Sequence, residues 1–176
     1  MSEVRTFTDR FARLSLTDVE RVLPLDGQLV SVDDSLTGRS FVSPARPVSL
    51  IRVTFYGIGE PPRWLESTVS EIARLADLRP DWDSYAARAT EVGSVMAAFE
   101  ALSLALAANA DAPLVLPAKD GGIRLEWHRD GRSLEITAAP RRREAFFAND
   151  ATNDEWEVDY NSFSERVVAA LRMFGE

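Results

Sequence analysis

An Asp-Gly pair between two alternating apolar runs is the feature that most constrains the fold of this chain. The runs are residues 123–128 and 133–137, and Asp130-Gly131 lies between them. Asp-Gly supplies the positive φ angles that a two-residue type I′ turn needs, so the pattern predicts a β-hairpin. Counting outward from the turn pairs Trp127 with Leu134 on one face of this hairpin.

The same register predicts a pair of like charges on the other face. While Leu125 pairs with Ile136, the register sets Glu126 opposite Glu135. Like charges placed directly opposite are unfavourable in a sheet. We therefore expect either a function for the acidic pair or compensation by a neighbour, and Arg124 and Arg132 are close enough in sequence to provide it.

Other strand patterns flank the hairpin. They cover residues 114–116, 145–148 and 156–160, and all the connections among them are short. Short connections favour an antiparallel meander, because parallel neighbours need crossovers of a dozen residues or more. Alternation places Trp156 and Tyr160 on the same face as Trp127, so we expect these aromatic side chains in the core rather than stacked on nucleic-acid bases.

Three helices are predicted around this meander. Apolar residues recur at helical spacing from residue 65 to Arg79-Pro80, where proline ends the pattern, and again from near Thr90 to Leu106. A capping box at residues 162–165 predicts a third helix near the end of the sequence. The fold class is therefore α+β: an antiparallel β-meander of four to five strands with helices packed on one face, plus an N-terminal β-containing extension.

The periodic patterns divide the chain near Gly59-Glu60-Pro61-Pro62. We predict an N-terminal extension over residues 1–60 and an α+β core domain over residues 61–176. Within the extension, residues 48–56 alternate as a strand, whereas the capping-box pattern Thr17-Asp18-Val19-Glu20 predicts a short helix through Leu23.

Composition excludes several classes of function. The sequence has 176 residues and no cysteine, which excludes disulfides, thiol nucleophiles and cysteine-based zinc sites. A net charge of −8 and a pI near 4.8 argue against nonspecific binding to a phosphate backbone. No apolar run is long enough for a membrane helix, and no signal-peptide pattern begins the sequence, so we expect a cytoplasmic protein without membrane contact.

A family resemblance covers about residues 70 to 160. It is carried by Trp82-Asp83-Ser84-Tyr85, residues 120–127, Leu134-Glu135-Ile136 and Glu155-Trp156. In these segments the chain resembles a group of small bacterial proteins of uncharacterised function, which join a Trp-Asp-Gly/Ser-Tyr loop to an Asp-Gly turn and a Leu-Glu-Trp strand. The resemblance brings no known catalytic activity, so no function is carried over from it, and it suggests an association with mobile-element neighbourhoods.

The loop residues Trp82, Asp83 and Tyr85 form a candidate pocket between two helices. In one reading, Asp83 accepts backbone hydrogen bonds and stabilises the turn while the aromatic residues bury apolar surface. In the other, the loop and the neighbouring sheet form a pocket in which Asp83 is a base, a ligand or a specificity contact.

The acidic pair Glu126 and Glu135 has two readings as well. Adjacent carboxylates can separate in pKa and support acid/base chemistry, and with Glu155, Glu157 or Asp159 they could bind a hard divalent cation. The alternative is an acidic surface that is solvated or faces a partner. We expect the second, with no catalytic residue, metal or cofactor.

Two further features carry charge. Residues Arg141, Arg142 and Arg143 follow a proline in a predicted loop, and with Arg124, Arg129 and Arg132 they could form one basic patch. Such a patch could bind nucleic acid or an acidic protein, or the arginines could pair with the acidic strands. His128 is the sole histidine, so a histidine-based triad has one possible base.

The sequence contains no Gly-rich phosphate loop, no His-Glu-x-x-His helix and no Gly-x-Ser-x-Gly elbow. These absences favour a non-enzymatic protein-interaction module, such as an accessory, inhibitor or immunity-type subunit of a bacterial or mobile-element system. We predict contact through Glu126, Glu135 or the 141–143 loop. The alternatives are a small metal-dependent hydrolase or nuclease that uses Asp83, Glu126 and Glu135, and a nucleic-acid binder that uses the arginine loop.

Overall fold

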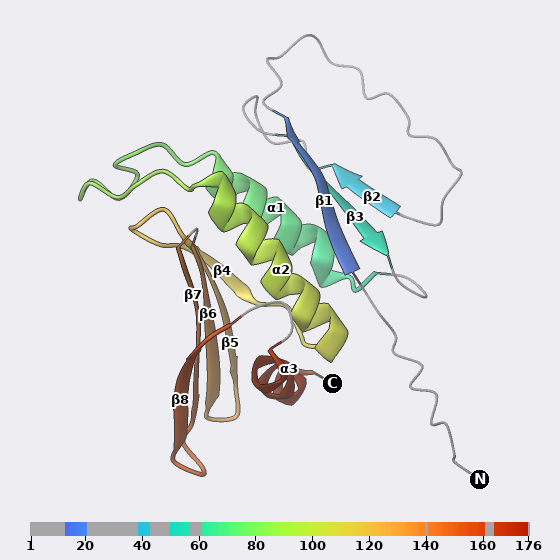
Figure 1. The fold of residues 1–176 in the computed structure, drawn as a ribbon, viewed down its shortest axis with the longest axis vertical. Helices are drawn as coiled ribbons and strands as arrows, with labels where there is room; N and C mark the ends of the chain where they lie inside the picture. Colours follow the sequence, from blue (N-terminus) through green and yellow to red (C-terminus); the bar gives the residue numbers. More distant parts are fainter. Residues whose placement is uncertain are drawn as a thin grey trace.

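Five antiparallel strands in sequence order form the main sheet in the computed structural model of the chain (Figure 1). The structure describes residues 13–20, 39–42, 50–56, 61–139, 141–160 and 164–175. The strands are β4 (Leu114–Pro117), β5 (Ile123–Arg129), β6 (Arg132–Ala139), β7 (Arg142–Asn149) and β8 (Asp154–Asp159). The order β4-β5-β6-β7-β8 confirms the predicted meander.

The β5–β6 hairpin has the predicted turn and register. Asp130 and Gly131 have φ angles of 48° and 71°, as a type I′ turn requires. Trp127 pairs with Leu134, and Glu126 with Glu135.

Helices cover one face of this sheet (Figure 1). They are α1 (Trp64–Ala76), α2 (Val92–Ala108) and α3 (Glu165–Leu171), followed by a 3-10 turn, η1 (Arg172–Phe174). α2 packs on β5 and β6 and also contacts α1 and α3. It is buried over much of its circumference, because small alanine side chains let neighbouring elements approach closely on several sides.

The core lies between these helices and the inner face of the sheet. Leu125, Trp127, Leu134, Ile136 and Phe147 are at most 2% exposed. The Phe147 and Trp156 rings stack with centroids 5.3 Å apart, and Tyr160 is also buried. The prediction that these aromatic residues belong to the core is confirmed for Trp127 and Tyr160, and Trp156 packs at its edge.

Three N-terminal strands form a second antiparallel sheet, with the order β1-β3-β2. They are β1 (Arg13–Glu20), β2 (Arg39–Val42) and β3 (Leu50–Tyr56). β1 contacts α2 and β3 contacts α1, so this sheet lies on the side of the helices away from the main sheet (Figure 1). The strand predicted within residues 48–56 is confirmed, and the division after residue 60 stays a prediction.

One local prediction is wrong. The segment Thr17–Glu20 is the end of β1, not the start of a helix, and Asp18 and Glu20 pair with Arg52 and Leu50 of β3. Long-range strand pairing outweighs the local capping pattern here, because capping residues contribute only about 1 kcal/mol. Residues 21–23 and the capping-box residue Ser162 lie outside the described ranges. No helix within those ranges has both the length and the apolar character needed to cross a membrane.

Candidate interaction surface

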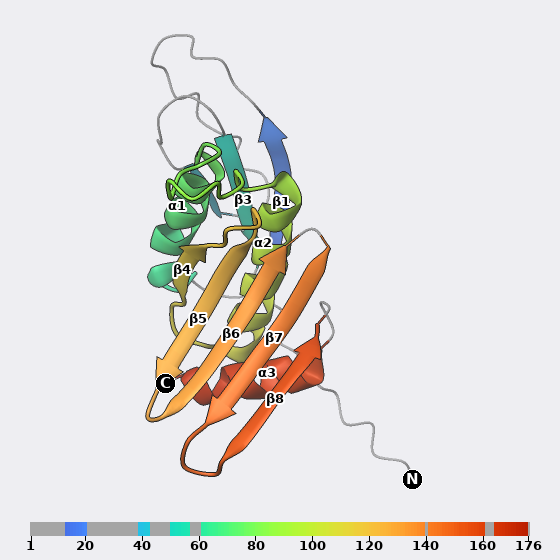
Figure 2. The same cartoon turned by 90° about the vertical axis from the view of Figure 1, so that its left-hand side faces the viewer.

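The outer face of the main sheet is the face directed away from the helices. In the described part of the chain, no helix or strand covers it (Figure 2). Strand alternation and the register between neighbours assign its residues. They are Leu114 and Leu116 on β4; Arg124, Glu126 and His128 on β5; Ser133, Glu135 and Thr137 on β6; Arg142, Glu144, Phe146 and Ala148 on β7; and Glu155, Glu157 and Asp159 on β8.

A charge network offsets part of the negative charge on the β5–β6 half of this face. The Arg124 guanidinium lies 3.2 Å from a carboxylate oxygen of Glu135 and 3.5 Å from one of Glu126. The second oxygen of Glu126 is 3.1 Å from Nε2 of His128. The predicted compensation is therefore provided by Arg124, whereas Arg132 forms no ion pair with another described residue. Sequence reasoning missed the contact between His128 and Glu126.

The β8 half of the face carries uncompensated negative charge. Glu155, Glu157 and Asp159 are exposed, and none of them forms an ion pair with another described residue. On the neighbouring strand, Glu144 lies 3.5 Å from Arg142. Unpaired carboxylates thus gather at the β8 edge of the sheet.

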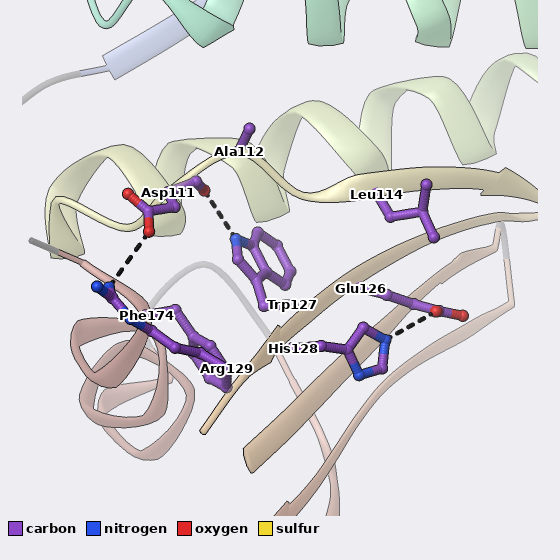
Figure 3. Close-up of a pocket in the computed structure, with 8 residues that line it drawn as sticks. All are labelled: Asp111, Ala112, Leu114, Glu126, Trp127, His128, Arg129 and Phe174. Atoms are coloured by element: carbon purple, nitrogen blue, oxygen red, sulfur yellow. Dashed lines mark hydrogen bonds and ion pairs between the residues drawn. The ribbon is translucent and has the colours of Figure 1, made fainter. Parts of the chain in front are cut away.

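A pocket of about 470 Å³ lies where β4 begins and β5 ends (Figure 3). Its lining residues are Asp111, Ala112, Leu114, Glu126, Trp127, His128, Arg129 and Phe174. Within it, the Trp127 indole donates a hydrogen bond to the Asp111 carbonyl over 2.8 Å. Arg129 donates to the Asp111 carboxylate over 3.3 Å and to the Gly175 carbonyl over 2.9 Å. No local sequence pattern indicates this pocket, because it needs the C-terminal segment to pack against the hairpin.

The candidate metal ligands are not grouped as a metal site requires. Among the described residues, no three His, Asp or Glu side chains lie together in a way that could hold a metal ion. Asp83 belongs to the α1–α2 loop, whereas Glu126 and Glu135 lie in the middle of β5 and β6. The set Asp83, Glu126 and Glu135 therefore does not form one site in this structure.

The 81–88 loop shows Asp83 in the turn-stabilising role. One carboxylate oxygen accepts hydrogen bonds from the backbone N–H groups of Tyr85, at 2.8 Å, and Ala87, at 3.1 Å. The N–H of Tyr85 is the main cause of the lowered pKa of Asp83, because it favours the ionised carboxylate. The Trp82 indole donates to the Arg88 carbonyl over 3.2 Å, while the Tyr85 side chain is 82% exposed.

The arginines at 141–143 do not share one loop. Arg141 lies in the turn before β7, and Arg142 and Arg143 are the first residues of that strand. Arg142 approaches the Asp120 carboxylate at 3.4 Å, and Arg143 forms an ion pair with Glu100 of α2. The second reading of this run, pairing with acidic side chains, therefore applies to two of its three arginines.

The single basic patch that the sequence left open is divided between two ends of the sheet in the described part of the chain. Arg129 and Arg132 occupy directly opposed positions in the strand register, at the turn end of the β5–β6 hairpin. Arg142 and Arg143 lie opposite Ala139 and Ala138 in the strand register, at the other end of β6. The length of the strands separates the two groups.

Comparisons with protein-family models, with curated proteins and with solved structures found no match to this chain. The resemblance to small bacterial proteins with a Trp-Asp-Gly/Ser-Tyr loop therefore stays a prediction.

Proposed function

We propose that this chain is a non-enzymatic protein-interaction module that binds a basic surface of a partner protein through the outer face of its main sheet. An accessory, inhibitor or immunity-type subunit has this kind of role. The observation that carries the proposal is the row of exposed, unpaired carboxylates on β8, Glu155, Glu157 and Asp159, beside a sheet face that no described element covers.

The two halves of the outer face contribute in different ways. On β5 and β6, Arg124 already pairs with Glu126 and Glu135, so a partner's cations gain little there. On β8 a partner's Lys or Arg side chains supply the counter-charges that the chain itself lacks. The exposed Leu114 and the half-buried Phe146 add apolar contact area, which interfaces combine with a polar rim.

Net charge supports the same partner chemistry. With a formal charge of −8, the protein attracts cationic surfaces at long range and accelerates encounter with them, an effect that salt weakens.

Affinity capture from a lysate of the native host, with the full chain as bait, tests the proposal. The double variant Glu155→Gln/Glu157→Gln removes two unpaired charges from the face, and Glu66→Gln/Glu165→Gln removes two exposed charges from the helices. We expect a stoichiometric protein partner to be retained by wild type and by the helix variant and to be lost from the β8 variant. Retention of the same partner by the β8 variant would contradict the proposed surface.

A catalytic test addresses the other half of the proposal. Purified protein with Mg²⁺ or Mn²⁺ should hydrolyse no nucleic acid, nucleotide or ester above background. Hydrolysis that disappears in Glu126→Gln would overturn the non-enzymatic assignment, because a binding surface alone gives no residue-specific turnover.

A further inference from the structure

A second pocket, away from the β8 edge, has three arginines among its lining residues. It has a volume of about 360 Å³ and is lined by Arg88, Glu91, Asp120, Ala139, Arg141 and Arg142. The arginines come from the α1–α2 loop, the β6–β7 turn and the first residue of β7. We propose that this pocket binds the phosphate group of a small polar ligand, such as a sugar phosphate.

Backbone hydrogen bonds join two of the segments that line the pocket, the α1–α2 loop and the β4–β5 turn. Arg88 donates its N–H to the Lys119 carbonyl over 2.9 Å, and Glu91 donates to the Gly121 carbonyl over 3.0 Å. Gly121 has a φ of +86°, and a Cβ atom there would lie 2.7 Å from the Ala89 carbonyl oxygen. This close approach holds the α1–α2 loop on the β4–β5 turn, so the arginines start from a preorganised frame.

The ion pairs already in the pocket are weak enough to rearrange. Arg88 lies 2.8 Å from Glu91 and Arg142 lies 3.4 Å from Asp120, but the two arginine side chains are 68% and 51% exposed. Exposed pairs contribute between about 0 and 1 kcal/mol. Arg141 forms no ion pair with any described residue and is available to a ligand.

The lining selects the class of ligand. A phosphate offers oxygens on several sides and accepts paired N–H groups from guanidinium, the geometry in which arginine binds best. Among the described residues that line the pocket, Ala139 is the only one with an apolar side chain, and the others carry charged groups that suit a charged ligand. The net charge of −8 opposes a long polyanion, which favours a single phosphate group over nucleic acid.

Titration of the ¹⁵N-labelled full chain with inorganic phosphate and with ribose 5-phosphate, at low ionic strength, tests the proposal. We expect saturable shifts of the backbone amides of Arg88, Gly121 and Arg142, and none with ribose. Arg88→Gln and Arg141→Gln should each weaken the affinity by about tenfold, which corresponds to about 1.4 kcal/mol. The control Arg172→Gln removes an exposed arginine in η1 and should leave the affinity unchanged.

The proposal is overturned if neither phosphate compound gives saturable shifts, or if Arg172→Gln weakens binding as much as the pocket variants do. The second result would mean that phosphate responds to overall charge rather than to this pocket. The spectra of the variants show in the same experiment whether each one is folded. Arg142 lines this pocket and also lies on the outer face, but Arg88→Gln and Arg141→Gln leave the β8 carboxylates unchanged, so failure of this proposal is distinguishable from failure of the protein-interaction proposal.

Discussion

Glu126 and Glu135 face each other across neighbouring strands, and a single guanidinium, that of Arg124, lies within 3.5 Å of both carboxylates. The arrangement explains how the sheet tolerates like charges at directly opposed positions. Arg124 lies two residues before Glu126 on the same face of β5, and its attraction to both carboxylates offsets their mutual repulsion.

Removing this cation should expose the repulsion. We expect Arg124→Gln to lower the free energy of unfolding by about 0.5 to 1 kcal/mol, a range that allows for the partial exposure of the pair. Adding Glu126→Gln should restore most of the loss, while Glu126→Gln alone should be nearly neutral. Urea unfolding of the three variants measures these values, and a rescue that fails would mean that Arg124 acts through packing of its aliphatic stem.

Trp127 should be a major contributor to stability. Its side chain is 2% exposed, and its indole N–H bonds to the Asp111 carbonyl. Trp127→Ala should cost about 3 to 5 kcal/mol, as for other large aromatic truncations in cores. Trp127→Phe keeps much of the apolar volume and should cost less, although it leaves that carbonyl without its donor. Equal losses in the two variants by chemical denaturation would contradict this division.

Two glycines with positive φ should differ in their tolerance of a side chain. At Gly131, with φ +71°, the nearest atoms to an added Cβ lie 3.6 Å away, so Gly131→Ala carries backbone strain of about 1 kcal/mol. At Gly121 the same strain is joined by the 2.7 Å approach to a backbone oxygen. Gly121→Ala should therefore be the more destabilising by at least about 1 kcal/mol, measured by thermal or urea unfolding.

Acid should remove the contribution of Asp83. The Tyr85 and Ala87 N–H groups lower the pKa of its carboxyl in the folded state below the usual 3.8. Its contribution to stability is therefore complete above that value and is lost as pH falls through the folded-state pKa. Asp83→Ala should lower stability at neutral pH and flatten the pH dependence below pH 3.8. Parallel curves of unfolding free energy against pH for variant and wild type would refute this.

Removing the hydroxyl of Tyr160 should not lower the stability of the fold. The hydroxyl oxygen is buried and has no hydrogen-bond partner among the described residues, and burial raises the pKa of the phenol above its usual 10.0. Because an unpaired buried hydroxyl carries a desolvation cost, Tyr160→Phe should be neutral or stabilising. A loss of more than about 1 kcal/mol would reveal a bonded hydroxyl instead.

The sheet was predictable because its determinants are local. The Asp-Gly turn and the alternating residues around it specify which positions face each other, and short connections leave few other ways to arrange the strands. The same alternation correctly separated the buried Trp127 from the outward-facing Glu126. At Thr17–Glu20 the prediction was wrong because the pairing partner, β3, is remote in sequence.

The candidate sites were less predictable for a related reason. The sequence identified the acidic pair Glu126 and Glu135, but the carboxylates without ion pairs lie on β8. Which carboxylates are paired depends on the direction in which each arginine side chain extends. The pocket beside Trp127 depends on Asp111, Phe174 and Gly175, and the arginine pocket is lined by both Arg88 and Arg141, which are remote in sequence. Contacts between segments so far apart are set by packing of the whole domain, which no local pattern encodes.

The acidic β8 strand also bears on how copies of this chain behave toward one another. Strand β8 ends the sheet, and in the described part of the chain it pairs with β7 alone. An exposed edge of this kind can template addition of another strand and lead to aggregation. A second β8 added antiparallel would bring Glu155, Glu157 and Asp159 of two molecules into one carboxylate-rich row, where mutual repulsion opposes growth. The charges that we propose as a binding site for a basic partner would therefore also oppose polymerisation of the protein through its own sheet.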